Sequence, residues 1–292
     1  MKIRFSTTQR IVLVAVLALS SAFSFSHRKS YQLFNSKGGK TSFKNLVKQA
    51  TKADVILFGE LHNNPICHWL ELELAKSVHD RSDRPLVLGA EMFETDNHQI
   101  LRQYLSKEIE EDSFENGCRL WPNYQTDYKP LVNFALKNEI NFAATNVPRR
   151  YARMVYRGGM EALDTLPDNE KAWIAPLPIE YDSTLKCYAD IFEMAGGHGG
   201  QNLPMAQAIK DATMAYNITK YRPDGAISIH YNGTYHSNNY QSIYWYLKRL
   251  DPTLEILTIA STEQESIDKL SKDEKGVADF ILVIESNMTK TY

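Results

Sequence analysis

The feature that most constrains this chain is a series of short apolar runs, rich in β-branched residues, that alternate with segments of helical pattern. Continuous apolar runs of about four to eight residues are typical of strands buried on both faces of a sheet. Because helical segments separate the runs, the sequence predicts an α/β fold, a mostly parallel open sheet with helices on both faces. The six runs occupy residues 53–59, 85–92, 140–147, 224–231, 254–260 and 279–285.

The segments between these runs carry helix signals. Asn64 can cap a helix that has Pro65 at its first position, and further helices are expected after Asp96, over 127–137 and over 236–250. Residues 149–221 contain no convincing strand pattern, and prolines and a glycine-rich run interrupt their helical segments. Since a connection this long usually carries function or helices of its own, we expect a helical insertion that acts as a lid over the carboxyl edge of the sheet.

The first 26 residues have the layout of a secretory signal peptide. Basic residues precede an unbroken apolar stretch at 11–19, which is too short for a membrane-spanning helix of about 20 residues, and small residues follow it. Cleavage fits near Ala22 or near Ser26, and we take residues 1–26 as the signal peptide and 27–292 as a single α/β domain. An uncleaved anchor is the alternative, and only then would the protein contact a membrane. The first cysteine is Cys67, so no lipid-attachment cysteine follows the apolar stretch. The predicted location is therefore exported, periplasmic or extracellular.

The charge balance bears on the class of partner. The chain has 33 Lys and Arg against 35 Asp and Glu, a formal net charge of −2. This balance provides no general attraction to polyanions, so we do not expect nucleic acid as a partner.

Acidic and imidazole side chains follow the predicted strands where ligands of open α/β sheets bind, beyond the carboxyl ends. Glu60 and His62 follow the first run, Glu91 ends the second, and His236 follows the fourth. We expect these four to meet in one crevice, where they could hold Zn²⁺ or Mn²⁺ or divide general acid and base work. Each also has a structural interpretation: Glu60 could bond loop amides, and His236 could cap a helix. The cluster makes a metal-dependent hydrolase, an esterase or peptidase, one candidate function.

Five segments together carry a resemblance to a known family, in the family's order and over about residues 53–250. The segments are 59–64 (Gly-Glu-Leu-His-Asn-Asn), 91–93, 146–149, 206–215 and 232–236 (Asn-Gly-Thr-Tyr-His). They resemble the ChaN-like haem-binding lipoproteins, which are similar to the Tiki proteases and the erythromycin esterases.

The resemblance implies an iron-regulated haem-uptake protein in which haem lies between two subunits and a tyrosine binds the iron. It also implies that Glu60, His62, Glu91 and His236 form a cluster of the hydrolase type. The expected cofactor is therefore haem, and the expected assembly is a homodimer on haem binding. The absence of the lipid-attachment cysteine departs from the lipoprotein pattern.

The insertion offers residues that suit a haem. A tyrosinate is a hard oxygen donor for ferric iron, and Tyr181 and Tyr188 share one face if their segment is helical. His198 lies in the glycine-rich run, and Arg149 and Arg150 could bind propionates. A tyrosine on an amphipathic helix is more commonly a packing residue, and the two arginines could be solvated. We favour an exported haem-binding protein of haem or iron uptake, with the hydrolase as the alternative and a non-catalytic binding module as the third hypothesis.

Overall fold

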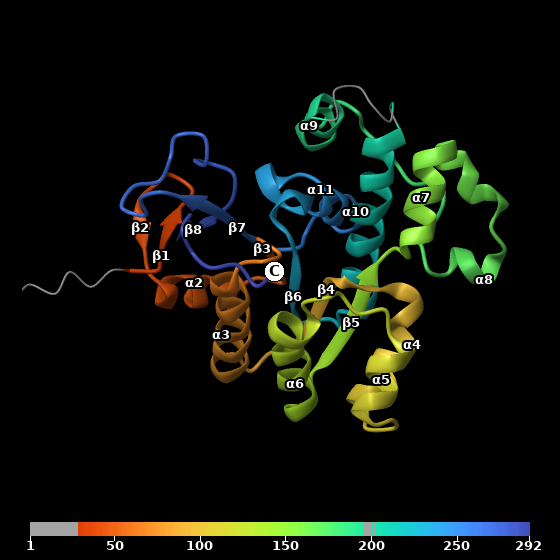
Figure 1. The fold of residues 1–292 in the computed structure, drawn as a ribbon, viewed down its shortest axis with the longest axis horizontal. Helices are drawn as coiled ribbons and strands as arrows, with labels where there is room; N and C mark the ends of the chain where they lie inside the picture. Colours follow the sequence, from red (N-terminus) through yellow and green to blue (C-terminus); the bar gives the residue numbers. More distant parts are fainter. Residues whose placement is uncertain (1–28, 195–199, 201) are drawn as a thin grey trace, which may run out of the picture. The chain divides into compact units, whose positions relative to one another are not determined.

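Eight strands form one sheet in the computed structural model of the protein, which describes residues 29–194, 200 and 202–292 (Figure 1). The order across the sheet is β2-β1-β8-β7-β3-β6-β4-β5. β1 runs antiparallel to both of its neighbours, whereas the pairs from β8 to β5 are all parallel. The strands are β1 (Tyr31–Asn35), β2 (Lys40–Thr41), β3 (Val55–Glu60), β4 (Leu86–Glu94), β5 (Asn141–Asn146), β6 (Ile227–Gly233), β7 (Ile256–Gln264) and β8 (Phe280–Glu285).

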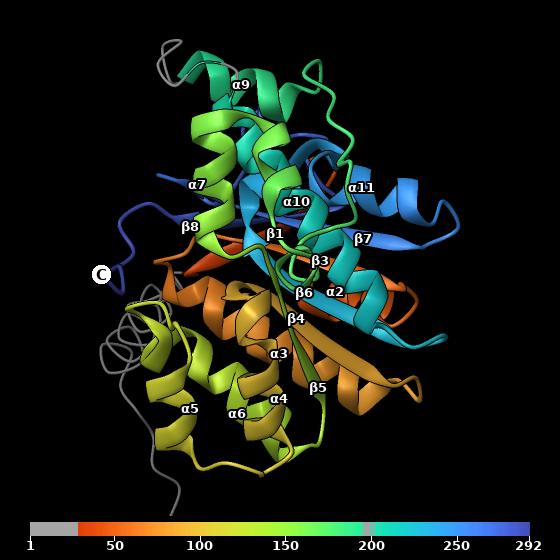
Figure 2. The same cartoon turned by 90° about the vertical axis from the view of Figure 1, so that its right-hand side faces the viewer.

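Helices cover the sheet in two layers. One layer consists of α2 (Phe43–Ala50), α3 (Pro65–Arg81), α4 (His98–Leu105), α5 (Glu111–Gly117) and α6 (Lys129–Lys137). On the opposite face lie α7 (Arg149–Gly158), α9 (Lys186–Met194), α10 (Asn202–Tyr221) and α11 (Ile243–Leu250) (Figure 2). The short helix α8 (Asp168–Lys171) follows α7. Shorter helical turns are Thr95–Asn97, Tyr124–Tyr128, Met160–Thr165, Thr234–His236 and Asn238–Tyr240.

The central strand β3 shows why its part of the sequence is a continuous apolar run. Ile56 and Phe58 pack into the core under α2 to α6, and Val55 and Leu57 pack into the core under α10 and α11. Successive side chains of a strand point to opposite faces, so a strand covered on both sides needs apolar residues at every position. The predicted fold class, a mostly parallel sheet between two helical layers, is confirmed.

Each of the six predicted runs overlaps one of the strands β3 to β8, although β3, β4, β6 and β7 extend beyond the carboxyl ends of their runs. The structure adds β1 and β2, which extend the sheet beyond β8 and which the sequence pattern did not predict. The Asn64 cap is also present, since its side chain accepts a hydrogen bond from the Ile66 amide and Pro65 begins α3.

The helix expected over 236–250 begins later, at Ile243. Asn239, Tyr240 and Ser242 have φ angles of 59°, 56° and 55°, which a right-handed helix cannot contain. His236 ends one short helical turn, Thr234–His236, and a second, Asn238–Tyr240, separates it from α11. This break leaves His236 directly after the end of β6, beside the crevice.

The described part of 149–221 contains the helices α7 to α10, joined by loops, and no strand. α7 and the turn after it have an apolar core of their own, with Tyr151, Val155, Leu163 and Ile174 among its buried residues. α10 has a second role, because its middle residues pack with Val55 and Leu57 of the sheet face. The predicted insertion thus supplies one of the two covering layers as well as residues at the edge of the sheet.

The expected signal peptide, residues 1–26, lies outside the described residues. Among the described residues, no helix is both long enough and apolar enough to cross a membrane.

Candidate functional site

The crevice lies where three parallel strands end side by side. β3 pairs with β6 so that Glu60 lies opposite Gly233, and β6 also pairs with β4, which continues to Glu94. The chain leaves β3 toward one side of the sheet and leaves β6 toward the other, which makes this a switch point of the topology. Residues at the ends of these strands therefore become neighbours although they are far apart in sequence.

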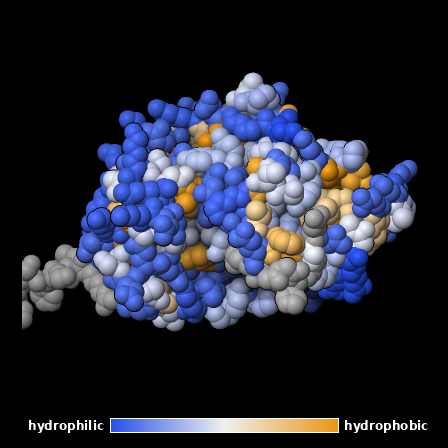
Figure 3. All heavy atoms as spheres, turned by 90° about the horizontal axis from the view of Figure 1, so that it is seen from above, coloured by the Kyte–Doolittle hydropathy of each residue, from blue (hydrophilic) through white to orange (hydrophobic). Residues whose placement is uncertain are grey.

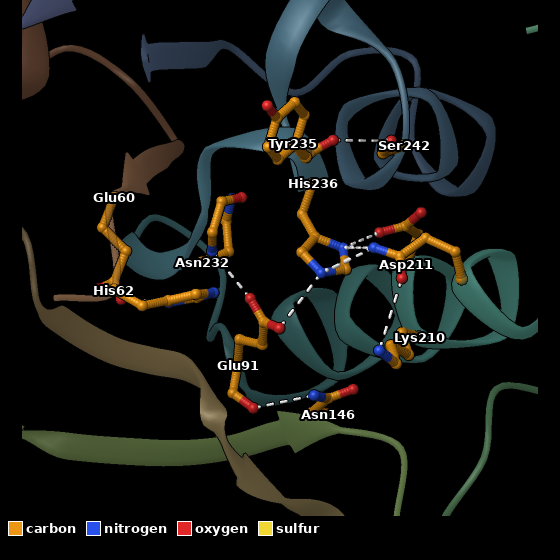
Figure 4. A network of polar contacts seen from close by, with 12 residues as sticks. Glu60, His62, Glu91, Asn146, Lys210, Asp211, Asn232, Tyr235, His236 and Ser242 are labelled. Carbon is orange, nitrogen blue, oxygen red and sulfur yellow. Dashed lines mark hydrogen bonds and ion pairs between the residues drawn. The ribbon is translucent and has the colours of Figure 1, made fainter. Parts of the chain in front are cut away.

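Glu91, His236 and Asp211 form a buried network in this crevice (Figure 4). Nε2 of His236 lies 3.2 Å from Oε1 of Glu91, and Nδ1 forms an ion pair with Asp211 of α10. The backbone amide of Gly233 donates to Oε2 of Glu91 at 2.8 Å. The amide of Gln207 lies within 3.0 Å of both ring nitrogens of His236. Both nitrogens of this imidazole are thus held by acidic partners.

The two acids control the charge of His236. Burial alone would lower the pKa of His236, but the nearby charges of Glu91 and Asp211 raise it to about 10. Burial would raise the pKa of Glu91, yet His236, His62 and the Gly233 amide hold it well below its usual range. The two acids therefore favour the protonated, imidazolium form of His236.

His62 occupies the other side of the crevice and is the more accessible imidazole, with 33% of its side chain exposed. Its Nδ1 lies 2.7 Å from Oε1 of the buried Glu60, which also accepts a hydrogen bond of 2.7 Å from Tyr128. Its Nε2 faces Gly233, where an added Cβ would come within 2.8 Å of it and 3.5 Å of Oε2 of Glu91. Burial lowers the pKa of His62, but Glu60 and Glu91 more than offset this and raise it. A side chain at 233 would therefore displace the His62 ring from its present position.

The four residues predicted to meet in one crevice, Glu60, His62, Glu91 and His236, do lie together. As a metal ligand set they are less suitable, because His236 already has an acid on each nitrogen. In the described part of the chain, the group whose ligand atoms lie within 4.8 Å of one another is Glu60, His68 and Glu71, which shares only Glu60 with the predicted set.

Tyr188 does not fit its predicted role as an iron ligand. The residue is 1% exposed, and its hydroxyl donates to Oδ2 of Asp211 at 2.9 Å, so it extends the His236 network instead. Tyr181 precedes α9 and is half-buried, and its ring centroid lies 5.4 Å from that of Tyr188. Together with Phe192 and Pro204, the two tyrosines line a hollow of about 200 Å³. His198 lies outside the described residues.

Arg149 and Arg150 lie at the start of α7 and line a groove of about 480 Å³. Arg119 and Arg153 add two further cations, and Leu120, Trp121 and Pro122 form an apolar wall. Arg119 and Arg150 both pair with Asp96, and Arg119 also pairs with Glu94. Trp121 contacts His62, with ring centroids 4.9 Å apart, so the arginine groove adjoins the crevice.

Several residues of the site could not be singled out from the sequence. Asp211 and Gln207 lie on α10, within segment 206–215 of the family resemblance, and this membership was the only sequence feature that pointed to them. No sequence pattern showed that α10 would face His236. Tyr235 is 73% exposed beside His236 and also lies within a family-like segment. His68, Glu71 and Trp121 carried no signal, because they reach the site only through the packing of α3 and of the loop after α5.

Chemically, the crevice can bind a polar group and transfer protons. A partly exposed imidazole oriented by a buried carboxylate is suited to general base work, and the adjoining groove supplies cations for an anionic ligand.

Comparison with known proteins identifies the family. The family described as "Haem-binding uptake, Tiki superfamily, ChaN" matches residues 46–247, well over half of the chain. A structure titled as cofacial haem binding to ChaN of Campylobacter jejuni is similar with a TM-score of 0.68 and 17% identity, covering 89% of this chain and 98% of that one. A mutant erythromycin esterase in its open conformation has a TM-score of 0.47 and 10% identity, covering 88% of this chain and 83% of that one. No curated protein matches. From the family match, the chain belongs to the ChaN family of haem-binding uptake proteins in the Tiki superfamily.

Proposed function

We propose that this protein binds haem after export and serves in haem or iron uptake. Membership of the haem-binding uptake family supports haem as the ligand. The fold is also similar to that of ChaN from Campylobacter jejuni, whose structure is described as showing cofacial haem binding. The single observation in this chain that carries the proposal is the arginine groove beside the crevice.

The arginine groove suits the edge of a haem that bears the propionates. Arginine binds carboxylates through two parallel hydrogen bonds, and an apolar wall can contact the ring. Within the described ranges, Arg149 and Arg153 form no ion pair with a carboxylate, so their guanidinium groups are available. Trp121 and Leu120 provide the wall.

Tyr181 is the remaining predicted tyrosine that could reach iron. It lies at the hollow with Phe192, which is 40% exposed, and its own side chain is only half-buried. The hollow is smaller than the roughly 300–1,000 Å³ of ordinary ligand pockets, so it can cover only part of a haem face. We therefore propose that a second copy of the chain, or a second haem, covers the rest.

A titration of the purified protein with ferric haem, followed by visible absorption, tests the proposal. We expect a saturable change, and a haem affinity lower by about tenfold or more in the double variant Arg149→Gln/Arg153→Gln, because two charge-assisted contacts are lost. The matched control is Arg157→Gln, an exposed arginine of the same helix that does not line the groove. A wild-type spectrum without saturable change would remove the proposal.

The same titration tests Tyr181 as the residue that binds the haem iron. Tyr181→Phe should alter the spectrum of the haem complex, whereas Tyr156→Phe, at an exposed tyrosine of α7, should not. Identical spectra for Tyr181→Phe and the wild type would show that the iron is bound elsewhere.

A hydrolase is the second candidate, and the arrangement of His62 favours it. Glu60 fixes Nδ1 of His62, which leaves Nε2 directed toward Gly233 and Glu91 in a partly exposed position. A carboxylate that orients an imidazole is the arrangement that makes histidine an effective general base. A screen of ester and peptide substrates would test this function with His62→Ala, and with His79→Ala at an exposed histidine of α3 as the control. Activity that is equal in the wild type and His62→Ala would exclude it.

A further inference from the structure

A second cluster of titratable groups lies beneath the crevice, between β3 and α3. His68 and Glu71 are one turn apart on α3 and face Glu60 at the end of β3. Nδ1 of His68 lies 3.2 Å from Oε2 of Glu71 and 3.8 Å from Oε2 of Glu60. All three residues are at most 6% exposed. One nitrogen and carboxylate oxygens thus converge on a small buried volume.

This cluster contains carboxylate oxygens that have no hydrogen-bond partner. Oε2 of Glu60 and Oε1 of Glu71 are buried and accept no hydrogen bond. Asp127 adds a third buried acid, 3.6 Å from Nε2 of His68. Among the residues that the structure describes, no lysine or arginine forms an ion pair with these three acids. Buried negative charge of this kind requires a cation or protons to balance it.

The orientation of His68 favours a metal cation. Its Nε2 lies 3.1 Å from the carbonyl oxygen of His62, and because a carbonyl only accepts, Nε2 carries the hydrogen and donates it. In the neutral imidazole, Nδ1 then presents its lone pair to the two glutamates. A lone pair that faces two carboxylates is repelled unless a proton or a metal cation lies between them. Metal-binding histidines characteristically donate their other N–H to a carbonyl or carboxylate, as His68 does.

We propose that Glu60, His68 and Glu71 bind a divalent first-row metal ion, with Zn²⁺ and Mn²⁺ as the ions that best match one imidazole and two carboxylates. Surrounding contacts hold the ligands in place. Tyr128 donates to the other oxygen of Glu60. Asn123 and Thr291 donate at 2.7 and 2.8 Å to Asp127, which lies beside Nε2 of the ligand His68. Because Glu60 also contacts His62, the ion fixes the carboxylate that orients the imidazole of the crevice.

Metal uptake by the haem-free protein tests the site. The protein is dialysed against a chelator and then against ZnCl₂ or MnCl₂. The number of metal ions bound per chain is measured by inductively coupled plasma mass spectrometry. We expect one ion per chain and a higher unfolding temperature with metal than with chelator. In Glu71→Gln we expect the affinity to fall by tenfold or more and the metal-dependent rise in unfolding temperature to disappear.

Two control variants show whether the ion binds at this cluster or elsewhere on the chain. Glu73→Gln carries the same substitution on the same helix, where Glu73 pairs with Lys76, and should bind metal as the wild type does. His236→Gln should also retain the ion, because His236 belongs to the crevice network. Because Glu71→Gln removes a buried charge, its unfolding temperature in chelator should equal or exceed that of the wild type. No metal uptake, equal uptake in Glu71→Gln, or uptake lost only in His236→Gln would overturn the proposal.

Discussion

His236 is the residue whose surroundings could least be foreseen from its neighbours in the sequence. The pattern predicted that it would lie near Glu91, because both follow strands that end at the same edge of the sheet. The second acid, Asp211, comes from α10, and the direction of a helix face relative to a sheet depends on tertiary packing that local periodicity does not encode.

The stability of the protein should depend on the charge of His236. Its pKa is raised from 6.5 to about 10 in the folded chain, so the folded state keeps a proton that the unfolded state loses. The resulting stabilisation is complete below about pH 6.5 and is lost as the pH rises through about 10. Denaturant unfolding of the wild type should show a free energy that falls over this range, and His236→Gln should show a smaller slope. Equal slopes would contradict the assigned ion pairs.

Tyr188 provides a second test at the residue scale. Tyr188→Phe removes the hydroxyl that donates to the buried Asp211, so we expect a loss of about 1–3 kcal/mol in the free energy of unfolding. Because this hydroxyl faces Asp211, the visible spectrum of the haem complex should not change. A changed spectrum together with unchanged stability would restore Tyr188 as a candidate iron ligand.

At the scale of elements, the six central strands were predictable from sequence, whereas the edge strands and the start of α11 were not. The runs that became β3 to β8 are apolar at nearly every position because both faces are covered, which is a strong local signal. β1 and β2 are short and lie at the edge of the sheet, where they lack that signal. The late start of α11 depends on residues with positive φ, and Tyr240 and Ser242 are not residue types that indicate such a conformation.

Gly59 shows how closely the elements at the site are packed. An added Cβ would lie 2.8 Å from the carbonyl oxygen of Ile259 on β7 and 2.9 Å from Cα of Thr234. Because both contacts are backbone atoms, Gly59→Ala should force β3 away from its neighbours and lower the free energy of unfolding by about 1–3 kcal/mol. Gly158→Ala, where the nearest atom is the Ala162 Cβ at 3.3 Å, should have little effect. Chemical denaturation compares the two variants, and similar stabilities would refute the close packing.

At the scale of the whole molecule, the proposed dimer depends on haem. The face that carries α9, seen from above, is mostly hydrophilic, with scattered apolar patches in its middle and toward its right-hand side (Figure 3). Permanent homodimers commonly use large apolar interfaces, so this face is better suited to an association that a shared ligand completes. The family resemblance suggested this assembly from sequence. The hollow at which we propose that it forms could not be inferred from local patterns, because it combines α9, α10 and the loop before them.

Native mass spectrometry with and without equimolar ferric haem tests the account most directly, since it reports ligand binding and assembly together. We predict single chains in the absence of haem and a haem-containing species of two chains in its presence, with less of that species in Tyr181→Phe. Spectra without any haem-bound species would contradict the proposed function, and haem bound only to single chains would contradict the shared site.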